Sequence, residues 1–235
     1  MAGHSHWAQI KHKKAQTDIK KSKILNKLIN NIVIAAKDGA DPELNPKLRS
    51  AVEKAKEFGV SKENIEKAIK RGSGSESGTI LEQIIYEGYG PGGVALVIKS
   101  ITDNRNRSAA QIRSVFNRHD AKLAIPGSVI WNFEEKGVIV VEKSDKISEE
   151  SLFSLPIKDI KENTDSYVLM ADVERINDIR KDLENMGINI KEIKIEFLPK
   201  NYIEIDEKNK AKLQDLIDEL LELDDVQEVY TNLNE

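Results

Sequence analysis

The chain of 235 residues contains no cysteine, which excludes structural disulfides and zinc sites with cysteine ligands. It also lacks long apolar runs: the longest have five residues, as in Ile32–Ala36, whereas roughly 20 are needed to span a bilayer. The first residues do not contain the apolar segment of a secretory signal. These absences predict a cytoplasmic protein that does not associate with a membrane.

The net charge of −4 conceals an uneven distribution of charge along the chain. Residues 1–72 contain 16 Lys and Arg against 8 Asp and Glu, a net charge of +8, and the rest contains 20 against 32, a net charge of −12. Within residues 1–27, seven lysines accompany one acid, Asp18, which gives +6. A cationic arm of this kind predicts binding to a polyanion, and nucleic acid is the leading choice.

The residues of this arm that we expect to contact phosphate are Lys11, Lys13, Lys14, Lys20, Lys21, Lys23 and Lys27. Trp7 and His12 are candidates to stack on a base or a sugar. The alternative is a solvated tail and helix start that has no partner. His4, His6 and His12 have no carboxylate nearby to complete a coordination shell, so we expect no metal site in the arm.

Three helices are predicted between residues 18 and 72, because apolar residues recur there at spacings of three and four. Asn45 and Pro46 are a typical helix start, with Asn as the N-cap and Pro at the first helical position. Ser61 starts the third helix. The three helices predict a small bundle, and the composition of residues 73–78 indicates a linker after it.

Beyond the linker the pattern predicts strands at residues 84–86, 94–98 and 129–133, with a helix at 108–119. From Gly137 a strand, a helix, two strands, a helix and a strand are expected, at residues 138–141, 148–155, 157–161, 167–171, 174–186 and 193–197. This order is that of the ferredoxin-like plan. A strand at 202–205, a helix through 213–221 and a strand at 226–230 then complete the preceding sheet.

We therefore predict a multidomain α+β protein. An N-terminal three-helix domain is followed by two ferredoxin-like α+β domains, one of them inserted in the other. The predicted domains are residues 1–78 for the basic arm and helical bundle, 79–136 with 200–235 for a discontinuous α+β domain, and 137–199 for the inserted α+β domain.

Residues 88–93 match the pattern G-x-G-x-x-G, but a β-rich segment follows where a dinucleotide site requires a helix. A wide turn between two strands is the better interpretation. Tyr86 and Tyr89 lie at its edge, where they are candidates either to stack on nucleotides or to pack against the protein.

Arg105 and Arg107 lie at the start of a predicted helix whose exposed face adds Arg113. Backbone N–H groups at a helix start, together with two guanidinium groups, can form a seat for phosphate. The alternative is that Asp103 or Asn104 caps this helix and the arginines pair with the protein's own acids.

Catalytic chemistry has little support in the sequence. Ser108, Ser114 and Ser128 have no convincing base, and the acidic residues 218–225 lack the loop of an EF-hand. We therefore expect no enzymatic activity and no cofactor.

Several segments resemble the YebC family: residues 1–7, 10–15, 32–37, 45–49, 86–93, 102–107 and 127–129. The resemblance covers essentially the whole chain and implies a cytoplasmic protein with one helical domain and two α+β domains. Members of this family are commonly described as probable transcriptional regulators that bind DNA. Others, among them a mitochondrial translational activator, are linked to ribosomes and to translation through proline-rich stretches.

The sequence thus predicts a non-enzymatic, nucleic-acid-binding regulator of gene expression that is a monomer. Its expected nucleic-acid partners are DNA or ribosomal RNA. The ribosome or RNA polymerase is a further expected partner. No recognition helix with base-reading side chains is evident, so specific duplex readout is not predicted. The alternatives are a ribosome-associated translation factor that contacts rRNA or tRNA, and a protein–protein adaptor whose arm is incidental.

Overall fold

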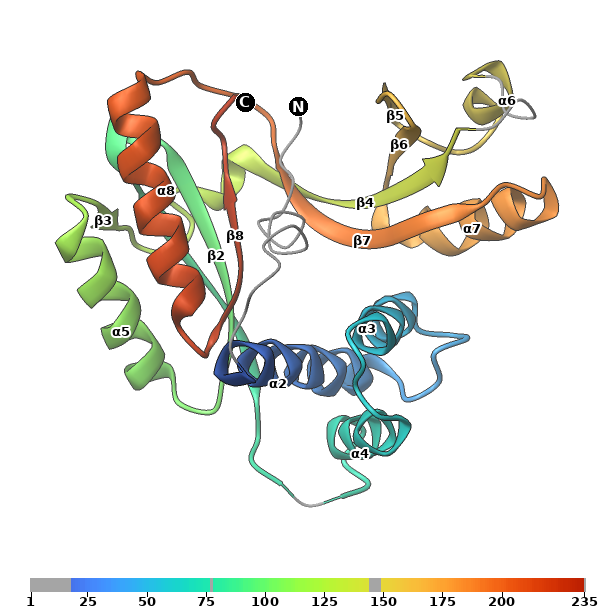
Figure 1. Ribbon diagram of the computed structural model, residues 1–235, viewed down its shortest axis with the longest axis horizontal. Helices are drawn as coiled ribbons and strands as arrows, with labels where there is room; N and C mark the ends of the chain where they lie inside the picture. The colour runs from blue at the N-terminus through green and yellow to red at the C-terminus, as the bar shows by residue number, and fades with distance from the viewer. Residues whose placement is uncertain (1–17, 77, 144–148, 235) are drawn as a thin grey trace. The chain divides into compact units, whose positions relative to one another are not determined.

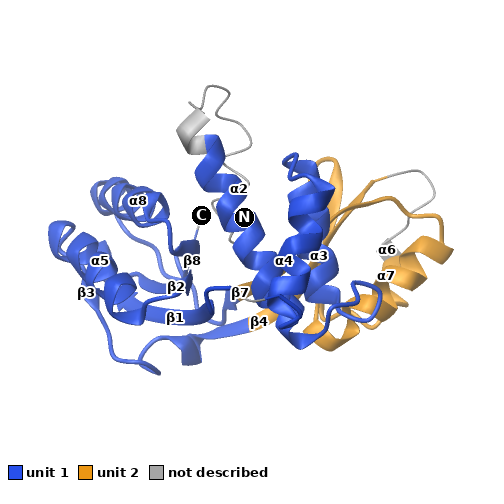
Figure 2. Ribbon diagram, turned by 90° about the horizontal axis from the view of Figure 1, so that it is seen from below, with its two compact units in different colours: residues 1–134, 198–235 blue, residues 135–197 orange. Residues whose placement is uncertain are grey.

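The computed structural model describes residues 18–76, 78–143 and 149–234 (Figure 1). The chain divides into two compact units (Figure 2). The larger unit comprises residues 1–134 and 198–235, and the smaller unit comprises residues 135–197.

The larger unit begins with the predicted helical bundle: α2 (Asp18–Ala35), α3 (Pro46–Glu57) and α4 (Lys62–Gly72). Both predicted N-caps are confirmed. Asn45 accepts a hydrogen bond from the amide of Leu48 at 3.0 Å, and Ser61 accepts one from Asn64 at 3.3 Å. At the end of α4, a Cβ on Gly72 would lie 2.2 Å from the carbonyl oxygen of Val33, so only glycine permits this approach to α2.

A four-stranded antiparallel sheet follows, with the strand order β3-β1-β2-β8. Its strands are β1 (Glu82–Tyr89), β2 (Ala95–Thr102), β3 (Lys122–Leu123) and β8 (Val226–Thr231). The Gly-rich segment is a turn between β1 and β2, as predicted, and it contains the short helix η2 (Pro91–Gly93). Gly92 and Gly93 have φ values of 72° and 78°, which favour glycine.

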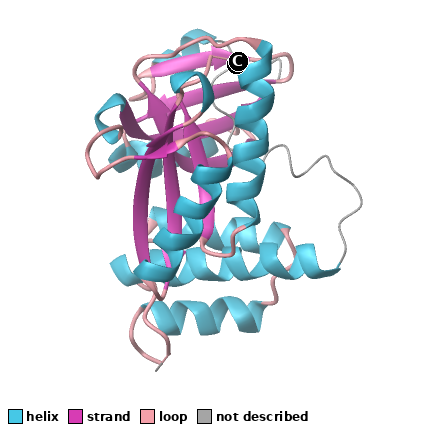
Figure 3. Cartoon of the chain, turned by 90° about the vertical axis from the view of Figure 1, so that its left-hand side faces the viewer, coloured by secondary structure: helices cyan, strands magenta, loops and turns pink. Residues whose placement is uncertain are grey.

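Two helices, α5 (Arg105–Arg118) and α8 (Glu207–Glu222), cover one face of this sheet (Figures 1 and 3). The buried core between them includes Leu96, Ile98, Ile112, Phe116, Leu213, Leu216 and Leu220. Gly88 faces this core, because a Cβ there would lie 2.4 Å from the ring of Phe116. Side chains alternate along a strand, so Glu87 and Tyr89 lie on the opposite face of the sheet.

Two predicted strands of the larger unit are wrong. Residues 130–132 form a short helix, η3 (Ile130–Asn132), and β4 (Phe133–Glu142) begins only after it. The backbone amides of Val129 and Ile130 bond to the carboxylate of Glu87, so they are not available to a neighbouring strand. Residues 202–205 form only an isolated bridge, between Ile203 and Leu233, because this pairing lies beyond the end of β8.

The smaller unit has the predicted element order of strand, helix, strand, strand, helix, strand. Its elements are β4, α6 (Glu149–Phe153), β5 (Asp159–Glu162), β6 (Ser166–Ala171), α7 (Ile176–Asn185) and β7 (Ile190–Pro199), with the short helix η4 (Val173–Arg175) before α7. The strand order is β5-β6-β4-β7. The core includes Ile139, Leu152, Leu169, Ile176, Ile179 and Leu183.

The larger unit follows a different order, β1-β2-α5-β3 and later α8-β8, so its described elements do not repeat the ferredoxin-like order predicted for it. The reason is the turn at residues 90–94, which makes β1 and β2 direct antiparallel neighbours. In the described ranges, none of the helices has the length and apolar character that a membrane span requires.

Candidate nucleic-acid interface

Part of the predicted interface lies outside the described residues. Trp7, Lys11, His12, Lys13 and Lys14 belong to this part of the arm, and so does the side chain of Lys20. Their predicted role in binding nucleic acid rests on the sequence alone.

Two of the arm lysines hold the end of another helix. Lys27 is 7% exposed, and its Nζ donates a hydrogen bond of 2.6 Å to the carbonyl oxygen of Leu221. Lys23 donates to the carbonyl oxygen of Glu222 at 3.2 Å and pairs with Asp224 at 3.2 Å. The last carbonyl groups of a helix have no partner within the helix and carry partial negative charge. Lys23 and Lys27 therefore stabilise the C-terminus of α8.

The environment of Lys27 favours the loss of its proton. Burial lowers the pKa of Lys27, the nearby acids Asp224 and Glu222 oppose this effect, and the result is a pKa of about 8. Lys27 is thus a buried structural group rather than a surface partner for phosphate.

Two other predicted cations are accessible. Lys21, on α2, is exposed, and no ion pair joins it to another residue that the structure describes. Arg113, on α5, is likewise exposed and has no such partner among the described residues. These two side chains are available to an external anion.

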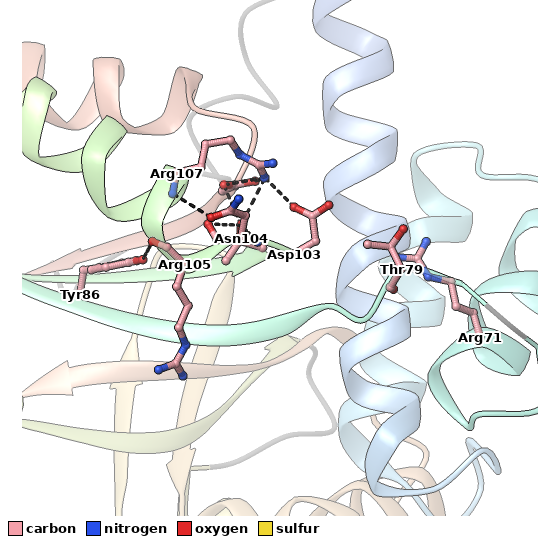
Figure 4. A network of polar contacts seen from close by, with 9 residues as sticks. Arg71, Thr79, Tyr86, Asp103, Asn104, Arg105 and Arg107 are labelled. Carbon is pink, nitrogen blue, oxygen red and sulfur yellow. Dashed lines mark hydrogen bonds and ion pairs between the residues drawn. The ribbon is translucent and has the colours of Figure 1, made fainter.

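Arg107 is held by two acids at the start of α5 (Figure 4). Its Nη2 donates to Oδ1 of Asp103 at 2.8 Å and lies 3.1 Å from Oδ1 of Asp225. Thr102 donates a further hydrogen bond of 2.9 Å to Asp225. Hydrogen bonds to both acids raise the pKa of Arg107, and the bond to Asp103 has the larger effect.

Arg105 is paired as well. Its Nε donates to Glu82 at 2.8 Å. Its carbonyl oxygen accepts a hydrogen bond of 3.3 Å from the hydroxyl of Tyr86, which Figure 4 shows. Asn104 is the N-cap of α5 and accepts from the amide of Arg107 at 3.1 Å. This arrangement matches the alternative left open above, in which Asn104 caps the helix and both arginines pair with acids.

The charge at this helix start does not favour phosphate in the arrangement described. The two arginines supply +2, and the three acids that contact them, Glu82, Asp103 and Asp225, supply −3. A phosphate group that approaches these guanidinium groups would therefore also be repelled by three carboxylates.

The two tyrosines at the Gly-rich turn differ in their surroundings. Tyr86 is partly buried and packs against the core beneath α5 and α8. Tyr89 is 41% exposed, and its hydroxyl donates to the carbonyl oxygen of Ser128 at 3.2 Å. Of the two, Tyr89 is the one whose ring is accessible.

Trp131 is an accessible aromatic residue that the sequence analysis did not select. It is 62% exposed, and its Nε1 donates to the same carbonyl oxygen of Ser128 at 2.9 Å. The apolar run at 129–133 predicted a strand, and Trp131 was therefore not considered as an exposed residue. One signal in the sequence could have indicated the correct structure: Glu87 is an acid within an otherwise largely apolar strand, so its carboxylate needs hydrogen-bond donors from elsewhere in the chain.

A metal site is not formed by the described residues, where no group of three or more His, Asp or Glu side chains is arranged to hold an ion.

Two family models match the chain, one over its N-terminal segment and one over the remainder. Residues 5–75 match the TACO1/YebC protein N-terminal domain, and residues 81–233 match the TACO1/YebC second and third domain. A probable transcriptional regulatory protein of Caldanaerobacter subterraneus is 46% identical over 238 residues, which cover 99% of this chain and 98% of that protein. A protein of the same description from Thermotoga maritima is 44% identical, with 99% and 93% covered.

A solved structure is also similar. The crystal structure of a conserved hypothetical protein from Aquifex aeolicus matches with a TM-score of 0.83 and 40% sequence identity. The match covers 98% of this chain and 97% of that chain, so the similarity includes both compact units.

Proposed function

The chain belongs to the TACO1/YebC family, and from this premise we propose that it is a non-enzymatic, DNA-binding regulator of transcription. Relatives that match over nearly their whole length are named probable transcriptional regulatory proteins, which supports a role in regulation. In this proposal the basic arm and the helical bundle contact phosphate, and the protein acts as a cytoplasmic monomer.

The excess of lysine at the start of the chain is the observation that carries the proposal. Seven lysines lie within residues 1–27, and two of them, Lys23 and Lys27, stabilise the end of α8. Five lysines then remain for phosphate: Lys11, Lys13, Lys14, Lys20 and Lys21. Since each phosphate contact contributes about −0.7 to −0.9 to the log–log salt dependence, five contacts predict a slope of roughly −3.5 to −4.5.

The test is to measure binding to a duplex DNA fragment over a range of salt concentrations. The arm variant replaces Lys11, Lys13 and Lys14 with Gln, and the control replaces the exposed lysines Lys181, Lys208 and Lys212 of α7 and α8, which lie outside the arm and the bundle, with Gln. Both variants lose three positive charges. The proposal predicts a slope of roughly −1.4 to −1.8 for the arm variant and little change for the control, because two arm contacts remain.

Two results would contradict the proposal. A shallow slope for the wild type would favour the adaptor alternative, since protein contacts release few counterions. Equal effects of the two variants would show that the arm has no special role. To separate DNA from RNA, ribosomes and the DNA fragment are offered in competition at the same salt concentration, and arm-dependent transfer to ribosomes would favour the translation alternative.

A further inference from the structure

The segment between β3 and β4 is fixed to β1 by one buried acid, Glu87, near the end of that strand. The carboxylate of Glu87 is 5% exposed and accepts three backbone hydrogen bonds, from Gly127 at 2.6 Å, Val129 at 2.6 Å and Ile130 at 2.8 Å. The carbonyl oxygen of Glu87 accepts a fourth, from Ala124 at 2.8 Å. Hydrogen bonds to an ionised acceptor are about twice as strong as neutral ones, so this loop is held in one arrangement.

The fixed loop brings Trp131 close to Tyr89, the last residue of β1, at the surface. Tyr89 and Trp131 both donate to the carbonyl oxygen of Ser128, at 3.2 Å and 2.9 Å. Their polar groups are therefore directed to the protein, while 41% and 62% of the two residues remain exposed. This surface therefore presents two exposed aromatic rings that are held in place by hydrogen bonds, with little rotamer freedom left to lose on binding.

A cation adjoins the rings. Lys122 is directly opposite Tyr89 in the register of β3 and β1, so the two side chains lie on the same face of the sheet. Lys122 is exposed, and it forms no ion pair with any residue in the described part of the chain. The first acid after Trp131 in the sequence is Glu134. Its negative charge is paired with the ammonium group of Lys200, at 3.5 Å.

Proteins that bind single-stranded nucleic acids combine aromatic rings with nearby cations. The bases stack on the rings, and the cations bind the phosphates. Stacked bases within a duplex do not expose their faces, so duplex DNA cannot occupy the rings in this way. We propose that Tyr89, Trp131 and Lys122, which we call the aromatic platform, bind an unpaired base and its phosphate in a single-stranded segment. This inference rests on the proposed function, and it adds that the target contains unpaired nucleotides.

The test uses the fluorescence of Trp131 in the full chain. The protein has two tryptophans, so a Trp7→Phe background leaves Trp131 as the only indole. The probes are a single-stranded oligothymidylate of about 12 nucleotides, within the site sizes known for stacking proteins, and its duplex with the complementary strand. Stacking on the platform predicts quenching of Trp131 by the single strand and little quenching by the duplex.

Affinity gives the second measurement. Replacement of Trp131 by Ala is expected to weaken single-strand binding by about 5- to 150-fold, since stacking contributes about 1–3 kcal/mol per base. Trp131→Phe keeps a ring and is expected to retain most of the affinity. The control is Phe153→Ala in α6, which removes a ring of similar exposure, 63%, from another part of the chain. The salt slope of Trp131→Ala should match that of the parent protein, because stacking releases no counterions.

The possible failures are distinguishable. Salt-dependent binding of the single strand without quenching, or with equal affinity in the Trp131→Ala and Phe153→Ala variants, overturns the aromatic platform and leaves the proposed function intact. The absence of salt-dependent binding to either probe overturns both. Equal loss of affinity in Trp131→Ala and Trp131→Phe, with lowered melting temperatures, would show a structural role and also overturns the platform.

Discussion

The ammonium group of Lys27 on α2 lies 2.6 Å from the carbonyl oxygen of Leu221 at the end of α8. Lys23 makes the equivalent contact with Glu222 one turn earlier on α2, and Asn31 donates to Gln227 at 3.2 Å one turn later. One side of α2 is thus attached to the end of α8 and the start of β8. The lysines of this helix therefore differ in role: Lys23 and Lys27 are structural at this contact, whereas Lys21, nearer the start of the helix, is exposed.

Lys27→Met should change how stability depends on pH. The pKa of Lys27 is about 8 in the folded protein and about 10.5 when it is unfolded, so the unfolded chain binds more protons between these values. The free energy of unfolding of the wild type should therefore rise between about pH 8 and 10.5, by up to about 3 kcal/mol relative to Lys27→Met. Urea unfolding of both proteins across this range measures the difference, and parallel curves would contradict the assignment.

Glu228→Gln should remove part of the stability at neutral pH. Burial raises the pKa of Glu228, but Lys99, Lys54 and a hydrogen bond from Tyr230 outweigh burial and lower the pKa to about 2. A depressed pKa contributes stability above about pH 4.5 that is lost as the pH falls toward 2. We expect the variant to be less stable by about 2–3 kcal/mol at pH 7 and to converge with the wild type in acid.

The control for Glu228 is Glu53→Gln, which removes an exposed acid from α3. Its unfolding free energy should stay within about 0.5 kcal/mol of the wild type at every pH. If Glu228→Gln behaves in the same way, the charged contacts of Glu228 contribute no net stability.

Arg105 and Arg107 should differ in their effect on stability. Arg107 pairs with Asp225, whose side chain is only 13% exposed, and removal of Arg107 leaves this carboxylate with the hydrogen bond from Thr102 but without the guanidinium group that pairs with it. Arg105 and Glu82 are more exposed, at 67% and 38%, and exposed pairs contribute little. We expect Arg107→Ala to lower the melting temperature by about 2–4 °C and Arg105→Ala to change it by less than about 1 °C. Equal changes, measured by thermal unfolding, would contradict this distinction.

Glu87→Gln should loosen the loop that supports the aromatic platform. Gln has one acceptor oxygen where Glu has two, and its NH₂ group would face the amides of Val129 and Ile130 or of Gly127. Since a buried donor without a partner costs about 1–3 kcal/mol, a destabilisation of that size is expected. Hydrogen exchange should also increase at the amides of Gly127, Val129 and Ile130. Unchanged protection of these three amides would show that the carboxylate does not hold the loop.

The sequence predicted those parts of the fold whose signals are local. Asn45 and Ser61 were identified as helix caps because the bonded groups are only three residues apart in the chain. The element order of the smaller unit was predicted because each strand and helix there has its own apolar period. The run at 129–133 was misassigned because a side chain 42 residues earlier in the sequence takes its amides.

The candidate site divides in the same way. The excess of lysine in the arm is a property of the sequence alone, and so is the attraction to a polyanion that follows from it. Which lysines remain available is decided by the tertiary structure, because the partners of Lys23 and Lys27 lie more than 190 residues away. Tyr86 and Tyr89 differ for a related reason: alternation along β1 is local, but only the packing of α5 and α8 determines which face of the sheet is covered.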